Sequence, residues 1–141
     1  MPTQQSILLV DPDERTRAFL AGQLERLDVE VLTASDAEEA SRLLGEKDVR
    51  VMITELYLPV KAEKCLIAET RRAQPDRNLR IVAHTHRSLT ADRNWAMQAG
   101  ANAYLIKPTR AARMRHVVSR LLQTPAGTPA TSPYRAPTDR P

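Results

Sequence analysis

Cysteine and long hydrophobic runs are both nearly absent from this sequence. Cys65 is the single cysteine among 141 residues, which excludes an internal disulfide and a multi-cysteine zinc cluster. No apolar run approaches the roughly 20 residues that a membrane-spanning helix needs, and none follows a basic start as in a signal peptide. We therefore expect a cytoplasmic protein with no membrane partner.

The composition is that of a soluble globular protein, with 42% hydrophobic and 27% charged residues. A chain of this length buries a core without help from disulfides or metals. The net charge of +4 is unevenly spread, because residues 1–106 hold 14 basic and 16 acidic side chains and residues 107–141 hold 7 and 1. The basic charge at the C-terminal end indicates an interaction face there rather than a basic protein as a whole.

The composition changes abruptly at Thr124, after which proline recurs at every fourth residue from Pro125 to Pro141. Such a segment buries too little apolar surface to offset its conformational entropy. We therefore predict a folded domain over residues 1–123 and a disordered, proline-rich tail or linker over residues 124–141. A docking motif for a partner is the alternative role for this tail.

Five short aliphatic runs alternate with amphipathic stretches in the first 123 residues. Such runs are typical of buried parallel strands. They cover Ile7–Val10, Val29–Ala34, Val49–Ile53, Ile81–Ala83 and Ala103–Ile106. This alternation predicts an α/β fold, a doubly wound five-stranded parallel sheet between two layers of helices.

Several residues between the runs are typical of helix ends. Ser35 and Glu38 form a candidate capping box at the start of the second helix. Gly45 fits the C-terminal cap of that helix, and Gly100 fits the cap of a helix over Thr90–Ala99.

Four polar residues directly follow strands, where parallel α/β sheets carry their working sites. They are Asp11, Glu55, Thr85 and Lys107, after the first, third, fourth and fifth runs. Two carboxylates there are able to hold a hard cation. A lysine neutralises a phosphoryl group or pairs with a carboxylate, and a threonine hydroxyl donates a hydrogen bond to an anionic oxygen.

The blocks ILLVDPDE, VMITELYLP, IVAHT and AGANAYLIKP resemble the receiver domain of two-component response regulators, the CheY-like family. The resemblance covers about Ser6 to Gln123 and implies the (βα)5 flavodoxin-like fold. In that family two acids after the first strand bind magnesium, and an aspartate after the third strand accepts a phosphoryl group from a histidine kinase. A threonine and a lysine contact this group, and an aromatic residue in the fifth strand changes rotamer with it.

Carried over by position, the family's roles fall on these residues only in part. Thr85, Tyr104 and Lys107 keep the family identities, and the resemblance implies a cis peptide before Pro108. Tyr57 and Pro59 also match family positions. Asp11 takes the place of the first metal-binding acid, but Pro12 replaces the second acid and Glu55 replaces the phospho-accepting aspartate.

These two replacements predict a degenerate or pseudo-receiver. Pro12 has no carboxylate. Asp13 lies one residue beyond the position of the second metal-binding acid, and in one interpretation its carboxylate partly replaces the missing ligand. Glu55 is longer than aspartate by roughly 1.5 Å, and a misplacement of about 1 Å costs on the order of 100-fold in rate. We therefore expect weak or absent Mg²⁺ binding, no cofactor and no phosphorylation by the usual chemistry.

The sequence leaves two roles open for Glu55. It forms a structural salt bridge with Lys107, or it takes the place of a phosphoryl group and holds an active-like arrangement. We expect the second role to be recognised by Thr85 turned toward Glu55 and by an outward Tyr104.

The expected function is signalling through protein–protein contacts, without catalysis. In the family the fourth helix, fifth strand and fifth helix form the face for dimerisation and output, so the expected partners are a histidine kinase, a downstream effector or a second copy. One alternative is a receiver that is phosphorylated by way of Glu55 or Asp13. Another is nucleic-acid binding by the basic last helix and tail, for which no recognition motif is found. A flavodoxin-like enzyme ranks last, because no glycine-rich phosphate loop follows any strand.

Overall fold

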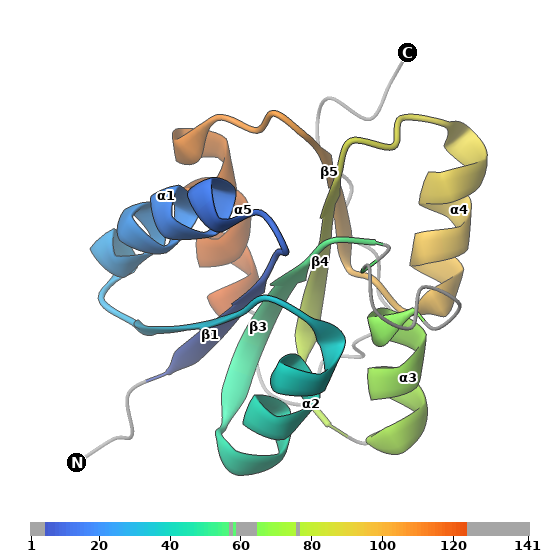
Figure 1. Cartoon of the computed structure of the whole chain (residues 1–141), viewed down its shortest axis with the longest axis horizontal. Helices are drawn as coiled ribbons and strands as arrows, with labels where there is room; N and C mark the ends of the chain where they lie inside the picture. The colour runs from blue at the N-terminus through green and yellow to red at the C-terminus, as the bar shows by residue number, and fades with distance from the viewer. Residues whose placement is uncertain (1–4, 57, 59–64, 76, 124–141) are drawn as a thin grey trace.

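The computed structural model describes residues 5–56, 58, 65–75 and 77–123. These residues form one parallel five-stranded sheet with the strand order β2-β1-β3-β4-β5. Helices α1 and α5 cover one face of the sheet, and α2, α3 and α4 cover the other (Figure 1). The predicted doubly wound, three-layer fold is confirmed.

Strands and helices alternate strictly along the chain. The strands are β1 (Ser6–Val10), β2 (Glu30–Ala34), β3 (Val49–Thr54), β4 (Arg80–Thr85) and β5 (Ala103–Ile106). The helices are α1 (Glu14–Leu24), α2 (Ala37–Glu46), α3 (Leu66–Ala73), α4 (Thr90–Ala99) and α5 (Ala111–Leu122), with a 3-10 turn over Glu25–Leu27. The expected runs differ from these strands by up to two residues at their ends, because backbone pairing extends past the apolar residues.

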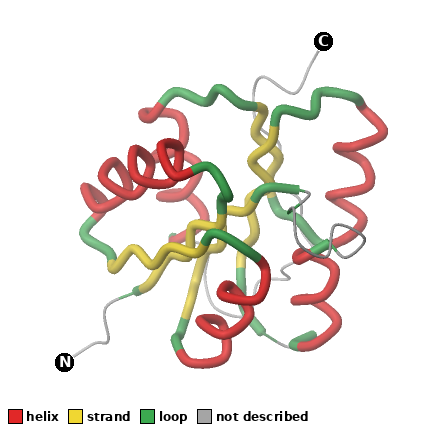
Figure 2. Tube along the Cα trace, in the orientation of Figure 1, coloured by secondary structure: helices red, strands yellow, loops and turns green. Residues whose placement is uncertain are grey.

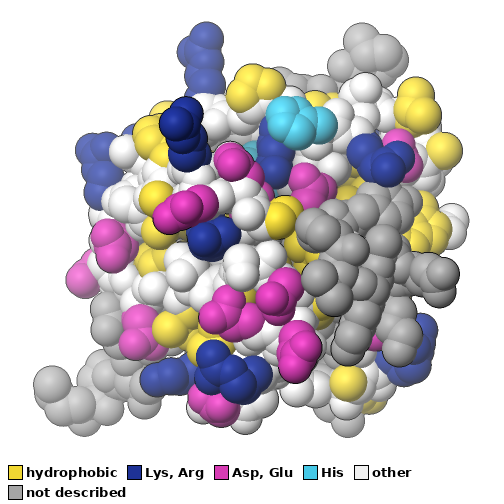
Figure 3. All heavy atoms as spheres, viewed as in Figure 1, with side chains coloured by type: hydrophobic (Ala, Val, Ile, Leu, Met, Phe, Trp, Pro, Cys, Tyr) yellow, Lys and Arg dark blue, Asp and Glu magenta, His cyan; other side chains and the backbone are white. Residues whose placement is uncertain are grey.

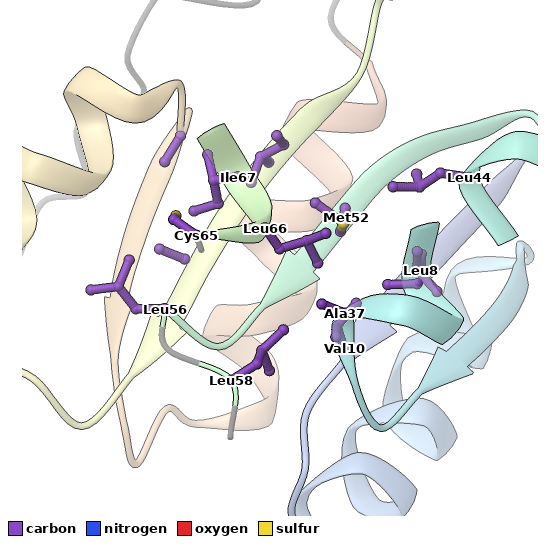
Figure 4. Close-up of a cluster of buried hydrophobic side chains, with 14 of the residues drawn as sticks. Leu8, Val10, Ala37, Leu44, Met52, Leu56, Leu58, Cys65, Leu66 and Ile67 are labelled. Atoms are coloured by element: carbon purple, nitrogen blue, oxygen red, sulfur yellow. The ribbon is translucent and has the colours of Figure 1, made fainter. Parts of the chain in front are cut away.

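Alternate side chains of the strands enter two separate cores. Leu8 and Val10 of β1 point toward α2 and α3, where they meet Met52, Leu44 and Leu66 (Figure 4). The residues between them, such as Ile7 and Leu9, pack against α1 and α5. Burial on both faces explains why the strands read as continuous aliphatic runs instead of an alternating pattern.

The helix ends agree only partly with the sequence expectations. The capping box lies one residue later than predicted, because Asp36 accepts from the Glu39 amide at 2.8 Å and Glu39 accepts from the Ser35 amide at 3.0 Å. The expectation for Gly45 is wrong, since α2 continues through Glu46 and ends at Lys47.

Gly100 does cap α4, with a φ of 123° that favours glycine. Its carbonyl accepts hydrogen bonds from Arg71 of α3, from Nε at 3.1 Å and from Nη2 at 2.8 Å. The same guanidinium donates to the Leu79 carbonyl and to Asn102 Oδ1. Arg71 therefore fixes the C-terminal end of α4 against α3.

Each helix runs back toward the edge of the sheet at which the strands begin (Figure 2). The carboxyl ends of the strands consequently meet at the opposite edge, together with the loops that follow them. None of the described helices is both long and apolar enough to cross a membrane. Residues 124–141, where a disordered tail was expected, lie outside the described residues.

Candidate functional site

The four residues expected at the strand ends do come together at the carboxyl edge of the sheet. Lys107 Nζ lies 2.8 Å from Asp11 Oδ2 and 3.0 Å from Glu55 Oε1. Backbone hydrogen bonds extend the sheet pairing past the three strand ends: the amides of Asp11, Glu55 and Lys107 donate to the carbonyls of Ala34, Val10 and Thr85, respectively. One ammonium group therefore joins the loops after β1, β3 and β5.

Both carboxylate oxygens of Glu55 are engaged. Oε1 accepts from Lys107, and Oε2 accepts from the Leu56 amide at 2.7 Å. The Thr85 hydroxyl is a further hydrogen-bond partner of this carboxylate. Burial alone would raise the pKa of Glu55, but the hydrogen bonds from Thr85, Lys107 and Leu56 outweigh burial and lower the pKa below its usual value.

Lys107 is held as a buried cation. Its side chain is 9% exposed, against 2% for Asp11 and 14% for Glu55. Burial would lower the pKa of Lys107, yet the hydrogen bonds to Asp11 and Glu55 raise it overall. The lysine therefore stays charged at neutral pH.

The carboxylate of Asp13 forms its hydrogen bonds outside this cluster. Its carboxylate caps α1, accepting from the backbone amide of Thr16 at 3.0 Å and from the Thr16 hydroxyl. These two hydrogen bonds lower the pKa of Asp13. Asp11 Oδ1 accepts from the Asp13 amide at 2.9 Å, and the intervening Pro12 is exposed. The cap is the ordinary role of an aspartate before a helix.

A hydrogen-bonded chain leads from Glu55 into the loop between β4 and α4. The Arg87 amide lies 3.4 Å from Thr85 Oγ1, and the Arg87 carbonyl accepts from the Tyr104 hydroxyl at 2.9 Å. Tyr104 is only 4% exposed. Of the two signs set out for an active-like role of Glu55, Thr85 turned toward Glu55 is present, whereas an outward Tyr104 is not. The tyrosine lies inward because its hydroxyl finds an acceptor in the backbone of this loop.

His84 and Thr109 form a buried contact on the opposite face of β4 that the sequence reasoning missed. Thr109 donates its hydroxyl hydrogen to the Ile106 carbonyl at 3.0 Å. His84 Nε2 lies 3.2 Å from Thr109 Oγ1 and is therefore the donor of that hydrogen bond. Nδ1 is buried without a hydrogen-bond partner among the described residues. Burial, followed by the charge of Lys107, lowers the pKa of His84 to about 4.

The remaining residues singled out in the sequence are placed as follows. Cys65 is buried at the start of α3, and burial raises the pKa of its thiol. The Lys107–Pro108 peptide is cis. Tyr57 and Pro59 lie outside the described residues.

The sequence profile of the response regulator receiver domain matches residues 7–119. The chain belongs to this family. The match includes every strand end described above, so Asp11, Glu55, Thr85, Tyr104 and Lys107 all lie within the receiver domain.

Two curated proteins similar to this chain differ in how much of their length it covers. A probable transcriptional regulator, ycf27, from Guillardia theta is 30% identical over 108 residues, which are 77% of this chain and 41% of that protein. An uncharacterized 14.6 kDa protein from Leptolyngbya boryana is 32% identical over 105 residues, 74% of this chain and 80% of that protein. The chain therefore spans less than half of the first relative and most of the second.

Solved receiver structures have the same fold. The chemotaxis response regulator CheY4 of Vibrio cholerae superposes with a TM-score of 0.76 at 22% identity, covering 84% of this chain and 99% of that chain. The receiver domain of NtrX from Brucella abortus also gives a TM-score of 0.76, at 26% identity with the same coverage. The protein is therefore a CheY-like receiver in a two-component signalling family.

Proposed function

We propose that this receiver signals through contacts with a protein partner, without phosphorylation and without catalysis of its own. The observation that carries the proposal is the closed pairing of Glu55, whose two carboxylate oxygens meet Lys107 and the Leu56 amide. An incoming phosphoryl group would have to displace these partners before bonding to the carboxylate. A cytoplasmic location belongs to the same proposal.

The donor set also argues against a magnesium site. Magnesium demands near-octahedral oxygen ligands. In proteins it usually keeps several bound waters and binds through one or two carboxylates. Here Pro12 supplies no carboxylate, Asp13 caps α1, and Asp11 and Glu55 share Lys107. Among the described residues, no group of three or more His, Cys, Asp or Glu side chains is arranged to hold a metal ion. We therefore propose that Mg²⁺ binds weakly or not at all.

The Glu55 carboxylate stands in for a phosphoryl group in one respect. Glu55 accepts a hydrogen bond from the Thr85 hydroxyl. The Arg87 amide in turn lies against the Thr85 hydroxyl oxygen, and the Arg87 carbonyl accepts a hydrogen bond from the Tyr104 hydroxyl. This arrangement links Glu55 to the start of α4 through hydrogen bonds alone. We infer that the loop is held in one conformation by Glu55, with no modification needed.

The surface next to this loop has the character of a protein contact. Leu89 is 68% exposed, Ile106 is 47% exposed and Trp95 is 40% exposed. Leu89 directly precedes α4, Trp95 lies in α4 and Ile106 ends β5. Exposed apolar side chains that gather in one region are typical of interaction sites. The neighbouring Arg110 of α5 is also exposed, which suits a partner with apolar and acidic groups, such as a kinase, an effector or a second copy.

Amide NMR spectra test the independence from phosphorylation. We expect no saturable shifts at Glu55 and Lys107 when the protein is titrated with Mg²⁺ and a small phosphodonor, or with beryllofluoride. Saturable shifts there would overturn the proposal. The double variant Pro12→Asp/Glu55→Asp should recover Mg²⁺ binding, whereas the matched Pro12→Asn/Glu55→Asp variant, which lacks the restored carboxylate, should recover much less.

A surface substitution tests the contact face separately. Ile106→Asp places a charge within the apolar surface of α4 and β5, and we expect it to weaken self-association or kinase binding at least ten-fold. Phe19→Asp is the matched control, because Phe19 is 56% exposed on α1, on the other layer of helices. Equal effects of both substitutions would count against this face.

A further inference from the structure

A groove between α2 and α3 is not used by the site described above. Its volume is about 360 Å³, and its described lining comes from Ala37, Glu38, Ser41 and Leu44 of α2 and from Glu69, Thr70, Ala73 and Gln74 at α3. The buried lining residues, Ala37, Leu44 and Thr70, form a mostly apolar floor, and Glu38 and Glu69 are the two carboxylates of the rim. Figure 3 shows acidic side chains gathered over α2 on this face of the molecule.

The two walls of the groove are joined at one end by Arg77. Its Nη1 donates to the Leu44 carbonyl of α2 and to Gln74 Oε1 at the end of α3, and its Nη2 donates to the Lys47 carbonyl at 2.9 Å. Three acceptors on two helices fix the spacing between the helices. The groove is therefore a fixed part of the fold, because α2 and α3 do not move independently of each other.

One carboxylate of the rim is available to a ligand. The neighbouring acids are engaged, because Asp36 caps α2 and Glu39 accepts from the Ser35 amide. Glu38 is exposed and has no hydrogen-bond or ion-pair partner among the described residues. A ligand for this groove should accordingly combine an apolar group for the floor with a cation for Glu38.

We propose that the groove binds the C-terminal segment of this same chain, residues 124–141, with Tyr134 over the apolar floor and Arg135 at Glu38. Residues 124–134 contain no charged side chain, and Arg135 is the first cation of the segment. The pair Tyr134–Arg135 supplies an apolar ring next to a cation, in the combination that the groove requires.

The geometry of the fold allows this contact. Helices α2, α3 and α5 all run antiparallel to the strands, so α5 ends at the same edge of the sheet as the Leu44 and Gln74 end of the groove (Figure 2). Three layers are about 30 Å thick, taking roughly 10 Å for each. Eleven residues follow Gln123 up to and including Tyr134, and at about 3.1 Å per residue they can span about 34 Å, which is enough to pass around this edge. Tethering also gives the segment an effective concentration near the millimolar range.

Paramagnetic relaxation measurements on the full chain test the proposal. A nitroxide attached at Ser132→Cys is specific for that position, because the native Cys65 is buried. We expect the label to broaden the amide signals of Ser41 and Ala73 at least about three-fold more than those of exposed residues on α1. Uniform weak broadening over the surface would overturn the proposal.

Charge substitutions and mixed samples sharpen the test. Glu38→Lys should remove most of the selective broadening, Arg135→Glu combined with Glu38→Lys should restore it, and Glu25→Lys on the α1 side should leave it unchanged. Broadening that survives Glu38→Lys unchanged refutes the role of this carboxylate. Broadening that appears when spin-labelled protein is mixed with isotope-labelled, unmodified protein assigns the groove to a second copy, which also overturns the intramolecular contact.

Discussion

Lys107→Met removes the only cation that we find between Asp11 and Glu55 among the described residues, and it keeps a side chain of similar length. At 3 Å and an effective dielectric constant of 20, each of the two ion pairs corresponds to about 5 kcal/mol of Coulomb energy. Desolvation offsets part of this energy, and breaking a buried pair typically costs about 3–5 kcal/mol. We take about 3 kcal/mol as the expected loss in the free energy of unfolding at pH 7.

The loss should depend on pH in a specific direction. In the native protein the pKa of Glu55 is lowered, so its contribution is present above the unfolded pKa of about 4.5 and is lost as the pH falls through the folded value. Without Lys107, the hydrogen bond and the positive charge that lower the pKa of Glu55 are lost, so this pKa is higher in the variant than in the native protein. The folded variant then takes up a proton at a higher pH than the folded native protein does, and the stability difference between the two proteins should shrink as the pH falls from 7 to 4.

Urea denaturation at 25 °C, followed by circular dichroism at both pH values, measures this difference. A loss of about 3 kcal/mol corresponds to a Tm lower by roughly 10 °C for a domain of this size. Arg42→Met is the control, because the Arg42–Glu46 pair is more than half exposed on α2 and should contribute less than about 1 kcal/mol. A loss below about 1 kcal/mol for Lys107→Met, or one that is equal at pH 7 and pH 4, would refute the reasoning.

Three other predictions follow from buried groups. The pKa of His84 is about 4, against 6.5 for a free imidazole, so the ring should remain neutral at pH 5 by NMR. The free energy of unfolding should fall by about 3 kcal/mol as the pH falls from 6.5 to 4, because the unfolded state then binds the proton more tightly. A ring that is charged at pH 5 contradicts this prediction. Gly100→Ala should cost about 2 kcal/mol in urea denaturation, since its Cβ would lie 2.6 Å from Arg71 Cγ at a φ of +123°, whereas Gly22→Ala in the open middle of α1 should be neutral or stabilising. Cys65 should react with a maleimide only on unfolding, and fast labelling of the native protein would show that the thiol is accessible.

The fold could be predicted from the sequence because both faces of the sheet are covered. Burial on both sides makes the strands continuous aliphatic runs, and the helices between them force parallel pairing. The site could also be predicted, since position at the carboxyl ends of parallel strands brings Asp11, Glu55, Thr85 and Lys107 to one edge whatever the details of packing.

What the sequence did not reveal depends on side-chain rotamers and on competition for hydrogen bonds. Ser35 and Asp36 are both good capping residues, and only the backbone decides that Asp36 caps α2. The sequence left the orientation of Tyr104 open between the two roles of Glu55, and its inward position follows from an acceptor, the Arg87 carbonyl, that no pattern of residue types displays. The contact between His84 and Thr109 joins residues 25 apart in the sequence, and no local signal relates them.

The two ends of α4 are held by different parts of the molecule. Arg71 binds the Gly100 carbonyl at the C-terminal end, where the guanidinium, with a pKa lowered by burial to about 10, is still charged at neutral pH. At the other end no side chain of the described residues caps the helix, and the preceding loop is attached through Arg87 to Thr85 and Tyr104. A change in the strand-end cluster should therefore rotate α4 about Gly100 as a hinge, with the largest displacement at Leu89, the most exposed apolar residue of the contact face.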